Sequence, residues 1–367
     1  MEIFFVLITI GFLLLHLYLY HGLSKSIALD NDLSDKLPFV SVIVAGRNEE
    51  KNIVACIDSL SKIRYPKDKL QIMLVNDKST DNTLTLMLEA TSGLTQFDVM
   101  TSRDIIHNNL RGKANAIDSA IEICKGEIIM MTDADCKVQP SWVLNTVKYF
   151  NEDVSMVCGF TLINSSNSLF AKLQCLDWIY LLTLASSSCG LKKIMSCIGN
   201  NLAFRKKAYD HVGGYRAIGF SVTEDLALMR KINEIKDSRI VYPVRYESLV
   251  MTEPCLTIKE LSSQKRRWFR GGTGVNTLGY VTGFELYTAS LLLILGYFFI
   301  GFKLWIILSS LILLSMILLM SRTALRLKSI RLFSLFLLFA AYFAVYGLLL
   351  PVSFLFGTKI NWKGRKF

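Results

Sequence analysis

The chain has 367 residues, of which 52% are hydrophobic and 19% are charged, and its formal net charge is +11. Soluble domains have roughly 25% charged residues and about 45–50% apolar ones even when glycine is counted, so part of this chain is expected to lie in lipid. The same numbers exclude a disordered chain, a collagen-like sequence and a small disulfide scaffold. At roughly 100–200 residues per domain, the length allows one sizeable globular unit besides membrane segments.

The first apolar run covers residues 3–20, with His16 as its strongly polar interruption. The run is about 18 residues long, which is just enough to span a bilayer core. A cleaved signal peptide begins with basic residues, whereas Lys25 comes after this run, so the pattern predicts a membrane anchor over residues 1–22. The same charge order favours an outside N-terminus and a cytoplasmic domain after the anchor.

Three more apolar runs follow Glu285. They cover residues 286–302, 304–320 and 332–356. We therefore expect about three membrane segments within 284–358, separated at Lys303 and by the basic stretch 322–331. Three crossings would leave the basic tail outside, against the positive-inside tendency, so one segment is a candidate for a re-entrant or interfacial helix.

Between these ends, β-rich stretches alternate with helix-like ones. Strands are expected at 39–45, 70–75, 97–100 and 127–131, and helices at 48–63, 81–90, 113–124 and 173–185. This alternation predicts an α/β domain with a mostly parallel sheet covered on both faces. Ligands bind such sheets beyond the carboxyl ends of the strands. In the last helix, Trp178 and Tyr180 are expected to pack into a core.

Polar side chains follow three of the predicted strands. The strand ends carry Glu49, Asp77, and the pair Asp133 and Asp135. A single Asp-x-Asp is more often a turn or a helix cap than a metal site. Here the pair follows an apolar strand in a sheet with other acidic strand ends. Two such carboxylates suit a hard divalent cation that keeps its remaining positions for water and phosphate oxygens.

Lys113 begins the helix expected at 113–124. A cation and free backbone N–H groups at a helix start suit a phosphate, although a solvated first-turn lysine gives the same pattern. The eight cysteines form no C-x-x-C pair and do not cluster with the four histidines. They predict buried, reduced thiols of a cytosolic domain rather than a zinc site.

The motifs follow one another in a recognisable order. They are Val44–Glu49, Asn76–Asp81, Gly112–Ala116, Asp133–Asp135, Gly199–Asn200, Thr223–Asp225, Gln264–Trp268 and Trp362–Arg365. With them the chain resembles the membrane-bound, inverting glycosyltransferases of family 2, which include cellulose, chitin and hyaluronan synthases. It also looks like the ceramide-type lipid glucosyltransferases. The resemblance is close over 38–272 and loose over the apolar ends, and D-x-D, T-E-D and Q-x-x-R-W carry most of its specificity.

This resemblance implies a Rossmann-like GT-A catalytic domain over 37–256 and an interfacial helix with the Q-x-x-R-W motif over 257–275. It further implies that Asp77 holds the nucleotide base or ribose, with Glu49 and Lys113 as further nucleotide contacts. Asp133 and Asp135 match the residues that position the sugar and ligate Mg²⁺ or Mn²⁺ on its diphosphate.

Asp225 matches the family's general base, which takes the proton from the acceptor hydroxyl. A carboxylate suits this step if burial or acidic neighbours raise its pKa. Consecutive side chains diverge, so only one of Glu224 and Asp225 is expected to face the sugar, and we favour Asp225. Gly199, Asn200 and Asn201 resemble the family's acceptor-side loop, in which Asn200 would take the place of a small polar residue and Asn201 would match the asparagine.

Gln264, Arg267 and Trp268 fall at i, i+3 and i+4, so on a helix they share a face. We expect Trp268 to stack on the acceptor and Arg267 to approach the leaving diphosphate. A basic helix that rests on anionic lipid is the alternative. Other basic residues of this segment are expected on other faces, where they serve the membrane: Lys265, Arg266 and Arg270.

The sequence thus predicts a multi-pass glycosyltransferase of the cell (inner or plasma) membrane with a cytoplasmic catalytic domain. It is expected to transfer a hexose from a nucleotide sugar, with a UDP-sugar favoured, to a lipid or a growing glycan. The short C-terminal region favours transfer to a lipid, and a processive polysaccharide synthase is the alternative. A non-catalytic nucleotide-binding membrane protein is disfavoured because the acidic positions are present. Nucleic acid is not an expected partner, since many Lys and Arg residues cluster beside the membrane segments.

Overall fold

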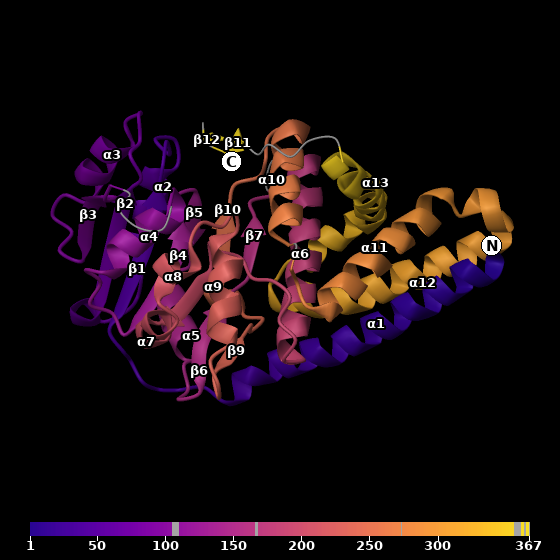
Figure 1. The fold of residues 1–367 in the computed structure, drawn as a ribbon, viewed down its shortest axis with the longest axis horizontal. Coiled ribbons are helices and arrows are strands. Elements are labelled where there is room, and N and C mark those ends of the chain that lie inside the picture. Colours follow the sequence, from indigo (N-terminus) through magenta and orange to yellow (C-terminus); the bar gives the residue numbers. More distant parts are fainter. Residues whose placement is uncertain (105–109, 166–167, 273, 356–360, 363–364, 367) are drawn as a thin grey trace.

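The computed structural model describes residues 1–104, 110–165, 168–272, 274–355, 361–362 and 365–366 (Figure 1). Side chains are described as far as Pro351, so those of the Trp362–Arg365 motif lie outside the described part. The backbone of that motif contributes to two short strands, β11 (Asn361–Trp362) and β12 (Arg365–Lys366).

A seven-stranded sheet forms the centre of the polar region. Its strands are β1 (Val40–Gly46), β2 (Leu70–Asn76), β3 (Phe97–Thr101), β4 (Ile128–Asp133), β6 (Val154–Cys158), β8 (Leu202–Arg205) and β9 (Arg239–Val241). The strand order is β3-β2-β1-β4-β8-β6-β9. The first four strands run parallel, β8 is antiparallel to both neighbours, and β6 and β9 are again parallel. The predicted α/β fold with a mostly parallel sheet is therefore confirmed.

A three-stranded sheet and several short helices complete this region. The small sheet has the order β5-β10-β7, from β5 (Cys136–Val138), β10 (Val250–Thr252) and β7 (Thr161–Ile163). The helices are α2 (Ile53–Ser61), α3 (Thr83–Ala90), α4 (Lys113–Ile121), α5 (Trp142–Val147), α7 (Lys206–His211), α8 (Gly214–Ile218), α9 (Glu224–Asn233) and α10 (Ile258–Gly271). Single 3-10 turns occur at Leu29–Asn31, Lys67–Lys69, Tyr246–Ser248 and Ile330–Leu335.

The period of two along β1 divides the core between the two faces of the sheet. Val42 and Val44 belong to the cluster that includes Ile53 of α2, whereas Ile43 belongs to the cluster that includes Ile117 of α4. Successive side chains of β1 therefore pack alternately against the helices on one face of the sheet and against those on the other. The carboxyl end of β1 is held between these layers, beside the ends of β2 and β4.

The helix predicted from residue 48 begins only at Ile53. Asn48 has a left-handed backbone (φ +54°), and its side-chain oxygen accepts a hydrogen bond from the backbone N–H of Thr80 at 2.9 Å. Asparagine tolerates this conformation better than most residues, and it cannot continue a helix there. The segment after β1 consequently forms a loop that ends in a turn, in which the backbone N–H groups of Asn52 and Ile53 donate hydrogen bonds to the Glu49 carbonyl oxygen (2.9 Å each).

In the part of the chain that the structure describes, five helices are long and apolar enough to cross a membrane: α1 (Glu2–Ala28), α6 (Leu169–Gly190), α11 (Thr277–Leu295), α12 (Tyr297–Arg326) and α13 (Phe336–Leu355). The expected break at Lys303 is wrong, because α11 ends at Leu295 and Lys303 lies inside α12. Lysine costs a helix little. The local irregularity in α12 is instead at Gly301, which has a φ of +72° that glycine adopts without strain.

Three of these helices, α1, α11 and α12, extend together to one side of the sheet, with the N-terminus at their far end (Figure 1). Phe5 contacts Phe299 near the turn between α11 and α12, and Arg326 at the other end of α12 forms an ion pair with Asp30 (2.5 Å). Helices α6 and α10 run across this group, between it and the sheet (Figure 1). Gly22 permits the close crossing of α1 and α6, since a Cβ there would lie 2.1 Å from the Ser187 carbonyl oxygen.

Candidate active site

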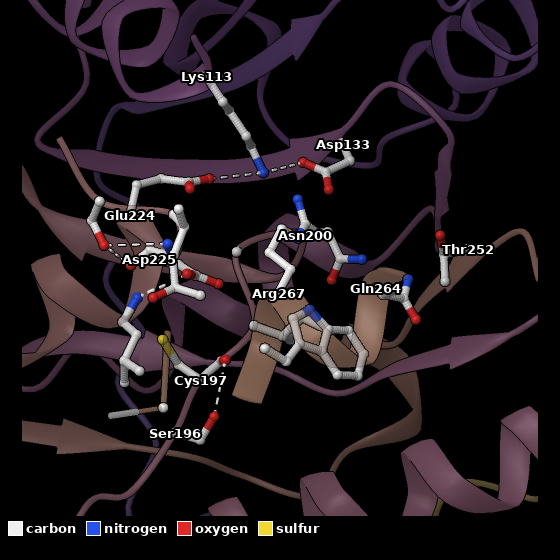
Figure 2. Close-up of a pocket in the computed structure, with 18 of the residues that line it drawn as sticks. Lys113, Asp133, Ser196, Cys197, Asn200, Glu224, Asp225, Thr252, Gln264 and Arg267 are labelled. Carbon is white, nitrogen blue, oxygen red and sulfur yellow. Dashed lines mark hydrogen bonds and ion pairs between the residues drawn. The ribbon is translucent and has the colours of Figure 1, made fainter. Parts of the chain in front are cut away.

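A cavity of about 560 Å³ opens at the carboxyl ends of β1, β2 and β4. All the residues that the sequence singled out for the site line it: Glu49, Asp77, Lys113, Asp133, Asp135, Asp225, Gln264, Arg267 and Trp268. Figure 2 shows several of them converging from the sheet, from α9 and from α10. Side chains separated by up to about two hundred positions in the chain therefore share one space.

The ends of β1 and β2 hold two buried carboxylates at one side of the cavity. Asp77 accepts a hydrogen bond from the Ser102 hydroxyl (3.2 Å), and its backbone carbonyl accepts one from the Arg47 guanidinium (2.9 Å). Glu49 accepts a hydrogen bond from the side-chain amide of Asn52 (2.9 Å). These contacts fix both acidic side chains before any ligand arrives, as binding of a sugar hydroxyl or a base N–H requires.

Lys113 lies at the centre of the acidic cluster. Its ammonium is 2.5 Å from Asp133 Oδ1 and 3.5 Å from Glu224 Oε1 (Figure 2). Burial would lower the pKa of Lys113, but the carboxylates of Asp133 and Glu224 outweigh burial and raise this pKa. A solvated first-turn lysine is thus contradicted, since the side chain is only 16% exposed and doubly ion-paired.

Asp133 and Asp135 offer hard oxygen ligands at the end of β4. Within the described ranges, no group of three or more His, Cys, Asp and Glu side chains forms a metal cage. Burial, reinforced by Asp135, raises the pKa of the neighbouring Cys56 thiol, which donates a hydrogen bond to the backbone carbonyl of Asp133 (3.6 Å). Two carboxylates beside a lysine fit Mg²⁺ or Mn²⁺ that takes its other ligands from a diphosphate and water.

Glu224 and Asp225 begin α9, and both line the cavity, but they contact different residues. Glu224 faces Lys113, whereas Asp225 faces Gly199, where a Cβ would lie 3.0 Å from Asp225 Oδ2. Burial and the charge of Glu224 raise the pKa of Asp225 to about 6, while Lys113 opposes this shift. A carboxylate with this pKa is suited to accept a proton near neutral pH.

The Q-x-x-R-W segment lies within α10, which the Thr257 hydroxyl caps by accepting a hydrogen bond from the Glu260 N–H. Gln264, Arg267 and Trp268 line the cavity from one face of the helix. The expectation that Lys265 serves the membrane surface is wrong, because its side chain is buried and forms an ion pair with Asp177 of α6. Lys265 and Trp268 are an i, i+3 pair, so Lys265 lies beside the face of α10 that lines the cavity rather than opposite to it.

The cavity wall also includes Asn200 and Trp178, which the sequence analysis named for other reasons, and Thr252, which it missed. Asn200 lines the cavity, whereas the side-chain amide of Asn201 is used in the core, where it accepts a hydrogen bond from the Trp142 indole N–H (2.9 Å). Trp178 packs against Trp268 (ring centroids 5.5 Å apart) and also lines the cavity. Thr252 reaches it from β10, a three-residue strand that is too short to give a sequence signal.

Away from the acidic cluster the cavity becomes apolar. Its wall there consists of residues from α6 and α11: Leu181, Leu182, Leu184, Ala185, Gly279, Thr282, Gly283 and Leu286. Gly283 leaves this part open, because a Cβ at that position would meet no atom within 4 Å. Since α6 and α11 are among the five long apolar helices, the cavity extends from the acidic cluster to the region of helices that are apolar enough to lie in a membrane.

Comparison with known families agrees with this geometry. The model of glycosyl transferase family group 2 matches residues 128–352, and that of glycosyl transferase family 2 matches residues 41–213. The chain belongs to glycosyltransferase family 2. Together the two matches cover the sheet, the acidic cluster, α10 and most of the apolar helices that follow it.

Two curated relatives of this glycosyltransferase differ in what their names say they make. Beta-monoglucosyldiacylglycerol synthase of Nostoc sp. is 26% identical over 243 residues, which are 66% of this chain and 50% of the relative. Poly-beta-1,6-N-acetyl-D-glucosamine synthase of Staphylococcus aureus is 27% identical over 246 residues, which are 65% of this chain and 55% of the relative. The chain thus spans about half the length of these curated relatives.

A solved structure supports the fold of the glycosyltransferase. The mannosyltransferase PcManGT from Pyrobaculum calidifontis, in complex with GDP-Man and Mn²⁺, superimposes with a TM-score of 0.58 at 18% identity. The match covers 95% of this chain and 98% of that one. The expected GT-A fold with long apolar helices at both ends is therefore confirmed.

Proposed function

We propose that this glycosyltransferase transfers a hexose from a nucleotide sugar, with inversion, to a hydroxyl group of a membrane lipid. One observation carries the proposal: a single cavity joins the acidic cluster around Asp133, the carboxylate of Asp225 and an apolar wall built by α6 and α11. The polar part suits a nucleotide sugar and the apolar part suits an acyl chain. We favour a UDP-sugar as the donor.

At the donor end, Asp77 and Glu49 are our candidates to bind the base or ribose. Asp133 and Asp135 are proposed to bind Mg²⁺ or Mn²⁺, which would neutralise the diphosphate as it leaves. Lys113 is proposed to add a second positive charge beside Asp133. Arg267 of α10 is proposed to make a bidentate contact with the diphosphate.

At the acceptor end, Asp225 is proposed as the general base. Its pKa of about 6 leaves it ionised at neutral pH, so it accepts the proton of the acceptor hydroxyl. That oxygen attacks the anomeric carbon while the nucleoside diphosphate departs from the opposite face, and the configuration inverts. Trp268 and Asn200 are proposed to orient the acceptor head group.

The need for a base itself favours a hydroxyl acceptor. A lipid phosphate is already an anion at neutral pH and needs no group to deprotonate it, whereas an alcohol does. A processive polysaccharide synthase remains the alternative, because one relative is named as a synthase of poly-beta-1,6-N-acetyl-D-glucosamine. The apolar wall around Leu182, Gly283 and Leu286 favours the lipid, since a glycan chain would need polar partners there.

We also propose a topology for the membrane part. Residues 1–22 would form the anchor, 37–256 the catalytic domain, 257–275 the interfacial helix and 284–358 the C-terminal membrane region. Basic residues at the sheet side of the helices, Lys25 of α1 and Arg322 and Arg326 of α12, favour a cytoplasmic catalytic domain in the cell membrane. Tyr346 in the later half of α13 reaches Asp177 of α6, which favours an interfacial or re-entrant α13.

The experiment is a donor screen with the purified protein in lipid nanodiscs. Each available UDP- and GDP-sugar is added with Mg²⁺ or Mn²⁺, and the extracted lipids are analysed by mass spectrometry. The proposal predicts a lipid that gains one hexose with one donor class. Release of a long polymer would overturn the lipid acceptor, and donor turnover equal in the wild type and Asp225→Asn would overturn the enzymatic account.

A further inference from the structure

A carboxylate lies in the middle of α6, one of the long apolar helices. Asp177 of this helix is fully buried (0% exposed) and does not line the cavity. A buried carboxylate is costly unless charged and hydrogen-bonding partners surround it. Its partners therefore show what the side chain holds in place.

Both partners of Asp177 come from other helices. The ammonium of Lys265, on α10, forms an ion pair with Asp177 Oδ2, and the hydroxyl of Tyr346, on α13, donates a hydrogen bond to Asp177 Oδ1 (2.5 Å). The ammonium also lies over two rings, 5.1 Å from the centroid of Trp268 and 4.9 Å from that of Tyr346. One carboxylate and one ammonium thus connect three helices.

This contact involves one of the two buried residues of α10. The structure describes all residues of α10, and only Leu261 and Lys265 of them are buried. Trp268 adds a partly buried contact with Trp178, the residue that follows Asp177 on α6. The charged pair therefore helps to fix the rotation of α10 about its axis, together with the Trp268–Trp178 contact and the close approach of Gly271 to Thr223.

We propose that Asp177 and Lys265 are positioning residues of this glycosyltransferase: their ion pair orients α10 so that Gln264, Arg267 and Trp268 face the cavity. Neither residue lines the cavity, so neither touches the substrates. An apolar contact would tolerate rotation of the helix, whereas an ion pair with a directional hydrogen bond from Tyr346 permits one orientation. The inference rests on the proposed function only where it assigns this face of α10 to the acceptor and the diphosphate.

The test measures the order of α10 directly. Hydrogen exchange is followed by mass spectrometry in nanodiscs for the wild type, Asp177→Asn, Lys265→Met, and the double variant Asp177→Asn/Lys265→Met. Each single variant leaves one buried charge without its partner, so exchange in 258–271 should be at least about tenfold faster, while peptides of β2 keep their protection. The double variant leaves no unpaired charge and should exchange more slowly than either single variant.

Two further variants make the result specific. Lys231→Met removes a lysine from an exposed pair with Glu234 (2.9 Å), so it is the matched control and should leave α10 unchanged. Tyr346→Phe removes only the hydroxyl and should give a smaller rise than Asp177→Asn, which keeps the test valid if a single variant fails to fold. If residues 258–271 exchange at the wild-type rate in Lys265→Met, the proposal is overturned. If Lys265→Met does not fold, a wild-type rate in Tyr346→Phe overturns it instead.

Kinetics separate this inference from the proposed function. Once a transferred donor has been identified, Lys265→Met should raise KM for the acceptor by about tenfold through Trp268, and should raise KM for the nucleotide sugar by a smaller factor through Arg267. A wild type that transfers no sugar contradicts the proposed function and leaves the exchange result to decide on the ion pair. If the wild type transfers sugar and KM for the acceptor is unchanged in both Lys265→Met and Asp177→Asn, the positioning role is overturned.

Discussion

The ammonium of Lys113 lies 2.5 Å from a carboxylate oxygen of Asp133, at the carboxyl end of β4. Lys113 also faces Glu224, so one cation neutralises acidic residues from two separate elements. The same lysine lowers the pKa of Asp225, which burial and Glu224 raise. The charge of Lys113 therefore links the donor end of the cavity to the proposed base.

Removal of this charge should move the pH profile of the reaction. Lys113→Met removes the positive charge that lowers the pKa of Asp225, so this pKa rises above its wild-type value of about 6. Because the base must be ionised, the acid limb of kcat/KM should shift to higher pH. The measurement is kcat/KM against pH for the wild type, Lys113→Met and the control Lys62→Met, which alters an exposed pair with Asp58. Superimposable acid limbs for the wild type and Lys113→Met would count against the coupling.

Asp225 should cost the folded protein stability at neutral pH. Its pKa is raised from 3.8 to about 6 on folding, so between these values the folded chain binds more protons than the unfolded chain, and its free energy of unfolding falls as pH rises. At pH 7, Asp225→Asn should therefore be more stable by on the order of 2 kcal/mol. Thermal unfolding in detergent checks this: Tm should rise at pH 7, and the gain should shrink toward pH 4. A lower Tm at pH 7 would contradict the burial argument.

The apolar part of the cavity can be filled from α11. A Cβ on Gly283 would meet no atom within 4 Å, so Gly283→Trp should place an indole in the space proposed for the acyl chain. We expect transfer to lipid to fall by at least about tenfold, while the affinity for the nucleotide sugar stays within about twofold. Val281→Trp, at an exposed position of the same helix, is the control. If Gly283→Trp loses donor binding, or if Gly283→Trp and Val281→Trp transfer sugar to lipid at the same rate, the acyl chain does not occupy this part of the cavity.

The proposed topology makes opposite predictions for two exposed positions. Phe298 lies at the turn between α11 and α12, and Lys36 lies between α1 and the sheet. On intact cells, an impermeant maleimide should label Phe298→Cys directly and Lys36→Cys only after permeabilisation. Seven of the native cysteines are buried and Cys255 is intermediate, so the wild type provides the background signal. The reverse labelling pattern would indicate that the catalytic domain lies outside the cell and would contradict the proposed topology.

Much of the site followed from local sequence signals. The β-rich stretches of β1, β2 and β4, which alternate with helix-like ones, predicted parallel strands, and the carboxyl ends of β2 and β4 bring Asp77 and Asp133 to one edge of the sheet. Helical spacing predicted the shared face of Gln264, Arg267 and Trp268. These features depend on neighbours within a few residues, which a single sequence displays.

The features that sequence reasoning missed depend on distant partners. Lys265 looked like one more basic residue of an interfacial helix, and its partner Asp177 lies 88 positions earlier in an apolar helix. Asn201 is held in the core by hydrogen bonds with Trp142, Phe160 and Ser248, whereas Asn200 lines the cavity. Asn48 takes a left-handed backbone in a loop that reaches across to Thr80. No local pattern marks such tertiary contacts.

The most direct test of the central claim compares two neighbouring carboxylates. With the donor identified, transfer of sugar to lipid is measured for the wild type, Asp225→Asn and Glu224→Gln at pH 7. If Asp225 is the base, Asp225→Asn should lower kcat by about 10²–10⁴-fold and Glu224→Gln, which keeps the base, by much less. Equal kcat values for Asp225→Asn and the wild type would contradict the account.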